Sequence, residues 1–307
     1  MSALATLLQD YLAVRRAMGY KLVKDEVVLT AFVGYLDERG MEVVTVEQAV
    51  AFVAAPLGAD RAWLANRMSM VRGFAAFLHA ADGRHQLAPA GLFPHGRHRA
   101  TPYFYADHEI AALIKAAAAL RVPVTALTIS ALIGLLAATG LRISEALALD
   151  VADVDLAAGM LTVRRSKYGR SRHVPLHPSV VTAITAYLDR RQHLLPDPAD
   201  PALFLTIVGT RKRIAHVEAT FRKLRAATGL AGRSANCRPR IHDLRHAFAV
   251  RTLIGWYRDG GDVAARLPLL SAYLGHRQPK YTYWYLQAAP ELLAEAALRL
   301  ELPKEST

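Results

Sequence analysis

The first third of the chain places apolar residues at the spacing of amphipathic helices. The repeats fall in three segments, at about residues 4–12, 23–39 and 59–79. Thr45 and Gln48 have the spacing of a capping box, in which each side chain bonds the backbone N–H of the other and a helix begins. The pattern therefore predicts an all-helical domain over residues 1–95.

The third of these segments also carries arginines at positions 61, 67 and 72. The spacing places Arg61, Arg67 and Arg72 on a helix face away from Trp63 and Phe74. In a basic protein this face is interpreted in two ways, either as a solvated surface or as a set of phosphate contacts, and the sequence leaves both open.

Apolar periodicity is lost between about residues 82 and 102, where Gly, Pro, His and Arg dominate. This composition is typical of a linker between domains, and we place the linker at residues 96–102. A second domain is predicted over residues 103–307. Its longest apolar run, about 126–141, falls short of a bilayer-spanning length and is interpreted as a buried helix.

Short runs with strand character interrupt the helices of the second domain. A strand is expected at 151–154, and the segments 160–164 and 172–176 are expected to pair as a hairpin. The pattern is helical again from about residue 178. The predicted fold class is mainly α with a small antiparallel β-sheet, in which a helical N-terminal domain is followed by an α+β domain.

Composition narrows the possible partners. The 307 residues are 53% apolar, as in a folded protein, and their formal net charge of +12 favours a polyanionic partner such as nucleic acid. Cys237 is the only cysteine, and no Cys/His cluster has the spacing of a zinc site. The N-terminus lacks the features of a signal peptide. We therefore expect a cytoplasmic protein without a membrane segment, a metal or a cofactor.

Four motifs of the second domain contain the residue types needed to attack a phosphodiester. They are the segment Thr139-Gly140-Leu141-Arg142, the stretch His242-Asp243-Leu244-Arg245-His246, the triplet Leu274-Gly275-His276, and the aromatic cluster that ends at Tyr285. Cleavage without a metal requires fixed cations for the phosphate oxygens, an acid for the leaving oxygen and a nucleophile. Arginine binds phosphate through paired N–H groups, and a tyrosine ester keeps the bond energy for rejoining. The motifs therefore indicate cutting and rejoining of DNA.

Together with the hairpin that contains Lys167, these motifs resemble the catalytic domain of the tyrosine recombinases, also called the phage integrase family. The resemblance covers most of residues 103–290, and Tyr285 lies at the family's distance after the Leu-Gly-His triplet. The first domain is similar in size and helical character to the family's core-binding domain, which is SAM-like. The resemblance therefore implies a core-binding domain followed by a catalytic domain.

The resemblance implies a role for each catalytic position. Arg142 and Arg245 would bind the scissile phosphate, and His276 would donate a hydrogen bond to it. Lys167 would protonate the leaving 5′ oxygen, although a lysine at a hairpin tip is also a common surface residue. His242 would serve as general acid/base near the tyrosine.

By the same resemblance Tyr285 would attack, which gives a 3′-phosphotyrosyl enzyme and a free 5′ hydroxyl. Tyr281 is the next candidate, because residues four apart share a helix face, whereas Tyr283 points elsewhere. The alternative is an aromatic cluster that only packs. Glu145 and His246 are expected to support the site structurally.

Further basic residues are expected to follow the DNA backbone. They are Arg67, Arg72, Arg164, Arg165, Arg170, Arg172, Arg211, Lys212 and Arg213. Phosphate contacts of this kind give affinity and salt dependence rather than sequence choice. The alternative for each residue is a solvated surface charge.

The resemblance implies a site-specific recombinase or integrase that acts on double-stranded DNA as a homotetramer, with a mobile element as its expected setting. An accessory protein or a second recombinase is a further possible partner. The alternatives are a type IB topoisomerase-like enzyme and a noncatalytic DNA-binding protein of the same fold. The tail, with Leu292, Leu293 and Leu300 at helical spacing, is amphipathic. It is expected to dock on a neighbouring protomer, as is frequent in this family, or on its own domain.

Overall fold

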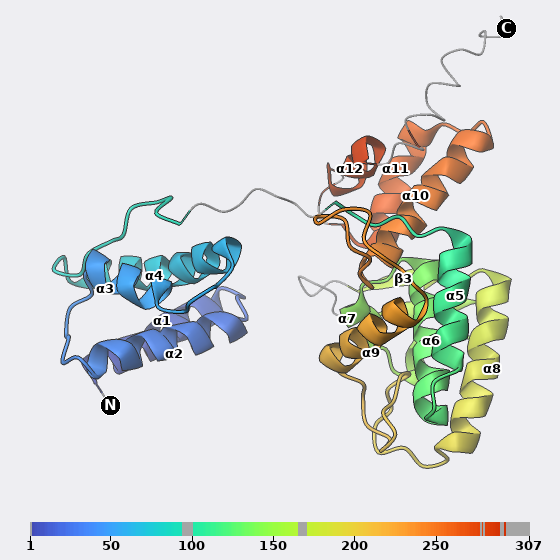
Figure 1. Cartoon of the computed structure of the whole chain (residues 1–307), viewed down its shortest axis with the longest axis horizontal. Coiled ribbons are helices and arrows are strands. Elements are labelled where there is room, and N and C mark those ends of the chain that lie inside the picture. Colours follow the sequence, from blue (N-terminus) through green and yellow to red (C-terminus); the bar gives the residue numbers. More distant parts are fainter. Residues whose placement is uncertain are drawn as a thin grey trace, which may run out of the picture. The chain divides into compact units, whose positions relative to one another are not determined.

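The computed structural model describes residues 2–93, 101–164, 171–276, 278, 280–288 and 292. The chain divides into two compact units, Met1–Arg99 and Ala100–Thr307 (Figure 1). Each unit has its own hydrophobic core. The linker predicted at 96–102 lies mostly outside the described residues, as does the predicted tail helix apart from Leu292.

The described part of unit 1 is helical. Its helices are α1 (Ala3–Ala17), α2 (Val23–Asp37), α3 (Val46–Ala54) and α4 (Arg61–Ala81). Their apolar faces meet around Leu12, Phe32 and Phe74, which are buried completely. The predicted capping box is present at the start of α3: Thr45 N–H donates to Gln48 Oε1 at 3.1 Å, and Gln48 N–H donates to Thr45 Oγ1 at 3.3 Å.

Two arginines of α4 make contacts within unit 1. Arg67 lies over the rings of Phe52 and Trp63, at 3.8 and 5.1 Å from guanidinium carbon to ring centroid. The predicted placement of Arg67 away from Trp63 is therefore wrong, because residues four apart share a helix face. Arg72 Nε donates to Ala88 O at 2.6 Å and holds the segment that follows α4.

Unit 2 combines helices with a small sheet. Its described helices are α5 (Asp107–Ala118), α6 (Pro123–Thr139), α7 (Ile143–Ala148), α8 (Pro178–Leu194), α9 (Ile214–Ala227), α10 (Asp243–Arg258), α11 (Val263–Leu274) and α12 (Lys280–Ala288). Helix α6 packs against α5, α8 and α10, so its apolar run is buried, as predicted (Figure 1). Within the described ranges, no helix has the length and apolarity needed to cross a membrane.

The sheet of unit 2 has the strand order β1 (Val154–Asp155), β2 (Met160–Val163) and β3 (Arg172–Pro175), all antiparallel. Alternate residues of β2 and β3 face the core, so the predicted hairpin is confirmed. The strand expected at 151–154 is replaced by a short 3-10 turn at Val151–Asp153. This turn forms because the Asp153 carboxylate accepts from the Asp150 backbone N–H.

Helices α10, α11 and α12 pack together around a second apolar cluster, and α11 also contacts β3. This packing brings the ends of α6, α10 and α11 close to the first residue of β3. The four motifs noted in the sequence lie at these element ends, at the N-terminus of α7, and on α12.

Candidate active site

The Arg142 motif turns the chain between α6 and α7. Gly140 ends α6 with a left-handed backbone (φ 61°), and a Cβ there would lie 2.5 Å from the Phe248 ring. Only glycine satisfies both conditions without strain. The turn places Arg142 at the N-terminus of α7, where its backbone N–H donates to Glu145 Oε2 at 3.0 Å. The position of the Arg142 side chain therefore depends on this glycine.

Glu145 is a buried anion beside Arg142, with a side chain that is 4% exposed. Its Oε1 accepts from Arg142 Nη1 at 2.7 Å, and Arg172 donates to both carboxylate oxygens at 3.1 and 2.8 Å. Burial raises the pKa of Glu145, but the hydrogen bonds and charges of the two arginines outweigh burial and lower the pKa to about 2. Glu145 therefore stays ionised and orients both guanidinium groups.

Arg172 links β3 to α7 and to the end of α11. In addition to its pair with Glu145, its Nε donates to Tyr273 O at 2.9 Å. The Arg172 side chain is only 13% exposed. Arg172 was predicted to contact DNA, and in the structure its donors bond Glu145 and Tyr273 O, so the contact with DNA stays a prediction. The expected support for the site from Glu145 thus involves a second arginine that the motifs did not identify.

Arg245 is almost completely buried, with 3% exposure. Its Nη1 donates to Gly140 O and its Nη2 to Leu274 O, both at 2.7 Å. Arg142 Nη2 donates to the next carbonyl, Gly275 O, at 3.2 Å. Because these carbonyls are consecutive, the two guanidinium groups lie close together. Burial, followed by the charge of Arg142, lowers the pKa of Arg245 to about 10, which leaves it charged at neutral pH.

His276 follows the left-handed Gly275 that ends α11. Its backbone N–H donates to Ser271 O at 2.9 Å, and its Nδ1 lies 2.8 Å from Thr282 Oγ1 on α12. Burial, followed by the positive charges of Arg245 and Arg142, lowers the pKa of His276 to about 3. The His276 ring is therefore neutral at pH 7.

Tyr285 lies on the buried face of α12 and is 2% exposed. Its hydroxyl is 3.0 Å from His246 Nδ1, and its ring stacks on His276 with centroids 6.3 Å apart. The His246 ring in turn meets His242 edge-on at 5.2 Å between centroids. His246 therefore contacts the tyrosine hydroxyl directly, in addition to supporting the helix.

His242 immediately precedes α10. Burial, followed by the charge of Arg245, lowers the pKa of His242. The adjacent Asp243 is buried completely and accepts from the Arg240 backbone N–H at 3.0 Å and from the Arg240 guanidinium. These bonds fix the start of α10, and with it the direction of His242, Arg245 and His246.

The other tyrosines of α12 are more exposed than Tyr285. Tyr281 and Tyr283 are each 47% exposed. The rings of Tyr281 and Tyr285 both lie against His276, each with centroids 6.3 Å apart, as expected for residues four apart on a helix. They differ in burial, because Thr282 takes the innermost position in the first turn of α12. Thr282 is buried completely and was not identified from the sequence. Its position one turn before Tyr285 is the only signal that the sequence offers.

The described cluster can bind an anion next to a hydroxyl. Arg142 and Arg245 are permanent donors, and a neutral His276 has one N–H to offer. A phosphate with several oxygens matches such a set. The predicted general acid, Lys167, lies outside the described residues, as do Arg165 and Arg170.

Some residues predicted to contact DNA bond or pack within the protein. Arg211 donates to two backbone carbonyls and pairs with Asp150, and Lys212 is 7% exposed with a pKa that burial lowers. The first side chain makes its hydrogen bonds within the protein and the second is buried, and contact of either with DNA stays a prediction. Arg164, which pairs with Asp150, and Arg213 are exposed.

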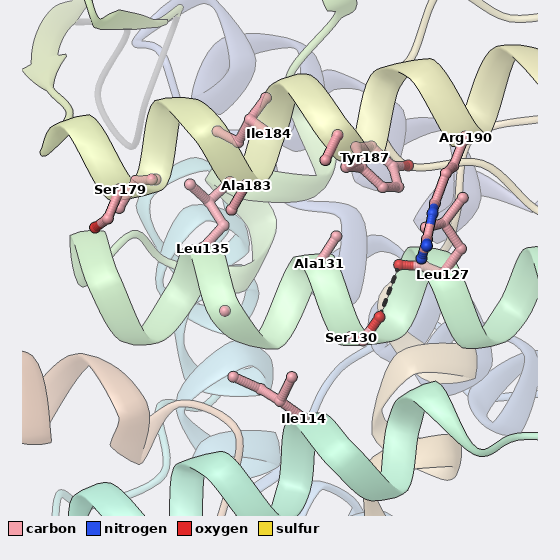
Figure 2. A pocket seen from close by; sticks show the side chains of 13 residues that line it. Ile114, Leu127, Ser130, Ala131, Leu135, Ser179, Ala183, Ile184, Tyr187 and Arg190 are labelled. Atoms are coloured by element: carbon pink, nitrogen blue, oxygen red, sulfur yellow. Dashed lines mark hydrogen bonds between the residues drawn. The ribbon is translucent and has the colours of Figure 1, made fainter.

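A groove elsewhere in unit 2 contains none of the predicted site residues. It lies between α6 and α8, with Ile114 of α5 on one side, and has a volume of about 330 Å³ (Figure 2). Its lining is mainly apolar and includes Leu135 and Tyr187. The hydroxyl of Ser130 bonds the Ala126 and Leu127 carbonyls of its own helix, at 2.7 and 3.1 Å. The groove is therefore separate from the cluster around Tyr285.

Comparison with known proteins identifies the family. The model of the phage integrase family matches residues 104–291. A protein of Sinorhizobium fredii named as the integrase/recombinase y4rB is 40% identical over 307 residues, which cover 98% of this chain and 98% of the relative. The chain therefore belongs to the phage integrase family. The predicted enzyme class, a tyrosine-type site-specific DNA recombinase, is confirmed at this level.

Solved structures agree in fold. The integrase of the transposon Tn1549, in complex with a circular intermediate DNA, has a TM-score of 0.63 and 17% identity, covering 96% of this chain and 99% of that one. A lambda integrase in a tetramer bound to a Holliday junction has a TM-score of 0.60 and 18% identity, covering 91% and 79%. At these identities the likeness shows the fold, and the predicted fold class is confirmed.

Proposed function

We propose that this chain cuts and rejoins double-stranded DNA at a specific site through a covalent link between Tyr285 and a 3′ phosphate. The observation that carries the proposal is the placement of Arg142 and Arg245 on the consecutive carbonyls of Leu274 and Gly275. His276 follows these carbonyls directly, and its ring stacks on that of Tyr285. A phosphate held by the two arginines would thus lie beside the tyrosine.

In the proposed reaction the Tyr285 oxygen attacks phosphorus, and the bond from phosphorus to the 5′ oxygen breaks. His242 acts as general acid/base for the tyrosine proton, and His246, which contacts the hydroxyl, links the two rings. Lys167 supplies the proton for the leaving 5′ oxygen. The 5′ hydroxyl of a partner strand then attacks the phosphotyrosine and restores the phenol, so the phosphodiester count is unchanged.

Unit 1 is proposed to be the SAM-like core-binding domain, over residues 1–95, with Arg67 and Arg72 near the DNA. The helical character of unit 1 supports this assignment. We further propose a homotetramer on DNA, by analogy with the lambda integrase tetramer on its junction. We also propose that the protein is cytoplasmic and serves a mobile element. An accessory protein or a second recombinase is a possible further partner, and the tail docks either on a neighbouring protomer or on its own domain.

Covalent capture in cells tests the proposed chemistry. Wild type and Tyr285→Phe are expressed, the cells are denatured, and protein-linked DNA is recovered and sequenced, with Tyr281→Phe as the matched control. We expect adducts from wild type and Tyr281→Phe at one sequence, with protein on the 3′ phosphate, and none from Tyr285→Phe. Adducts scattered over many sequences favour a type IB topoisomerase-like enzyme.

Rejoining can keep such an adduct rare, so a second substrate is needed. A nicked duplex that carries a site obtained by DNA-binding selection loses its 5′ hydroxyl strand after cleavage and traps the intermediate. Failure of wild type to form an adduct on this duplex would contradict the proposed chemistry and favour a noncatalytic DNA-binding protein.

A further inference from the structure

Thr282 is completely buried in the first turn of α12, three residues before Tyr285. Its hydroxyl lies 2.8 Å from His276 Nδ1, its single hydrogen bond among the residues that the structure describes. Six other helical threonines instead donate to the carbonyl four residues earlier: Thr6, Thr139, Thr182, Thr185, Thr220 and Thr252. The Thr282 hydroxyl is therefore directed at the histidine and not at its own helix.

The direction of this hydrogen bond follows from the chemistry of the two groups. If His276 Nδ1 carried the proton, the hydroxyl proton of Thr282 would be buried without an acceptor, which is unfavourable. If Thr282 donates, both groups are satisfied. A neutral imidazole has one ring proton, which must then lie on Nε2. The lowered pKa of His276 agrees with a neutral ring.

We propose that Thr282 is a positioning residue that fixes the tautomer of His276, so that Nε2 presents an N–H to the scissile phosphate. This inference rests on the proposed function, in which His276 donates to the phosphate. Arg142 and Arg245 can only donate. An unprotonated Nε2 would place an acceptor among these donors. It would repel the phosphate oxygen on which negative charge develops in the transition state.

The place of Thr282 in the chain links the tautomer to the nucleophile. Thr282 and Tyr285 lie one turn apart on the buried face of α12, and each bonds a histidine of another segment. His276 is consequently a fixed Nε2–H donor only while α12 occupies this position. The helix that carries the tyrosine thus also prepares the phosphate site.

The tautomer can be measured in the whole protein without DNA. Long-range ¹H–¹⁵N correlation spectra of protein labelled with ¹⁵N-histidine show which ring nitrogen carries the proton, and His276→Gln identifies the signal of His276. At pH 7 we expect the proton on Nε2 in wild type and in Thr282→Ser, which keeps the hydroxyl. Thr282→Val has the same shape without the donor, and we expect its His276 to move at least partly to Nδ1–H.

Cleavage of the nicked duplex gives a second readout. We expect the single-turnover rate of Thr282→Val to fall by up to about tenfold, the weight of one hydrogen bond, and that of Thr282→Ser to stay within about twofold of wild type. Melting temperatures verify that the variants fold.

The proposal is overturned if wild-type His276 carries its proton on Nδ1, or if Thr282→Val leaves both tautomer and rate unchanged. If Thr282→Val does not fold, the wild-type spectrum decides the position of the proton. A wild type that forms no adduct contradicts the proposed function, whereas the tautomer is still decided by the spectrum.

Discussion

Replacing Arg172 by methionine removes one partner of a buried ion pair and keeps a side chain of similar length. In the wild type, Arg172 donates to both oxygens of Glu145 and to Tyr273 O. After the substitution, Glu145 keeps Arg142 as a partner but loses two of its hydrogen bonds to a cation. We expect the free energy of unfolding of unit 2 to fall.

The structure sets the size of this loss. The pKa of Glu145 falls from 4.5 to about 2 despite burial. At about 1.4 kcal/mol per pKa unit, this shift corresponds to roughly 3 kcal/mol of net stabilisation of the charged form. Removal of one partner from a buried pair costs about 3–5 kcal/mol in other proteins. Because Arg142 remains, we expect a loss of about 3 kcal/mol at pH 7.

Urea unfolding followed by tryptophan fluorescence measures this loss. A Trp63→Phe background leaves Trp256 and Trp284 as reporters, both of them in unit 2. The control is Arg266→Met, which breaks a pair with Asp259 that is exposed on both sides, and its effect should stay below about 1 kcal/mol. A loss for Arg172→Met no larger than that of the control would refute the assigned role of the pair.

The pH dependence of stability tests the role of Glu145 independently. A carboxylate whose pKa is lower in the folded state stabilises the protein fully at pH values above its unfolded-state pKa. This stabilisation is lost as the pH falls towards the folded-state pKa. Wild type therefore loses the contribution of Glu145 between about pH 4.5 and 2, as set by the shift cited above. The difference between wild type and Arg172→Met should narrow below pH 4.5. A difference that stays constant between pH 7 and 3.5 would contradict the assignment to Glu145.

Three further predictions concern single residues of the site. Gly140→Ala should destabilise unit 2 by about 2–4 kcal/mol in urea, because a Cβ there meets an aromatic ring at a left-handed backbone, whereas Gly134→Ala in the same helix should have an effect below about 1 kcal/mol. The folded state keeps His276 neutral down to a pKa of about 3, so stability should decrease as pH falls below about 6.5, by about 2 kcal/mol at pH 5, and His276→Gln should remove this part of the slope. His246→Phe should slow adduct formation about tenfold, because the hydrogen bond between His246 and the Tyr285 hydroxyl is lost. An unchanged single-turnover rate would count against that contact.

The sequence was informative where apolar periodicity, helix caps or turn residues determine local structure. The apolar run of α6, the Thr45 capping box and the β2–β3 hairpin all appear as predicted, because each depends on residues close together in the chain. The prediction of a strand at 151–154 was wrong, because the Asp153 carboxylate bonds the backbone N–H of Asp150 and favours a turn there.

The site was only partly predictable, for a physical reason. The motifs identify Arg142, Arg245 and His276 by residue type, but they do not contain the partners that orient them. Arg172 lies 27 residues after Glu145, and Thr282 resembles any helical threonine until its hydroxyl is seen to bond a histidine. Such partners depend on tertiary packing, which spacing along the chain does not encode.

The identity of the nucleophile is the central claim, and tandem mass spectrometry of the trapped adduct tests it most directly. Trypsin cleavage after Lys280 and at Arg299 releases one peptide that contains Tyr281, Tyr283 and Tyr285. After nuclease digestion, a residual nucleotide marks the tyrosine that attacked. We predict the mark on Tyr285, the buried residue that contacts His246. A mark on Tyr281 or Tyr283, each 47% exposed, would contradict the proposed active site.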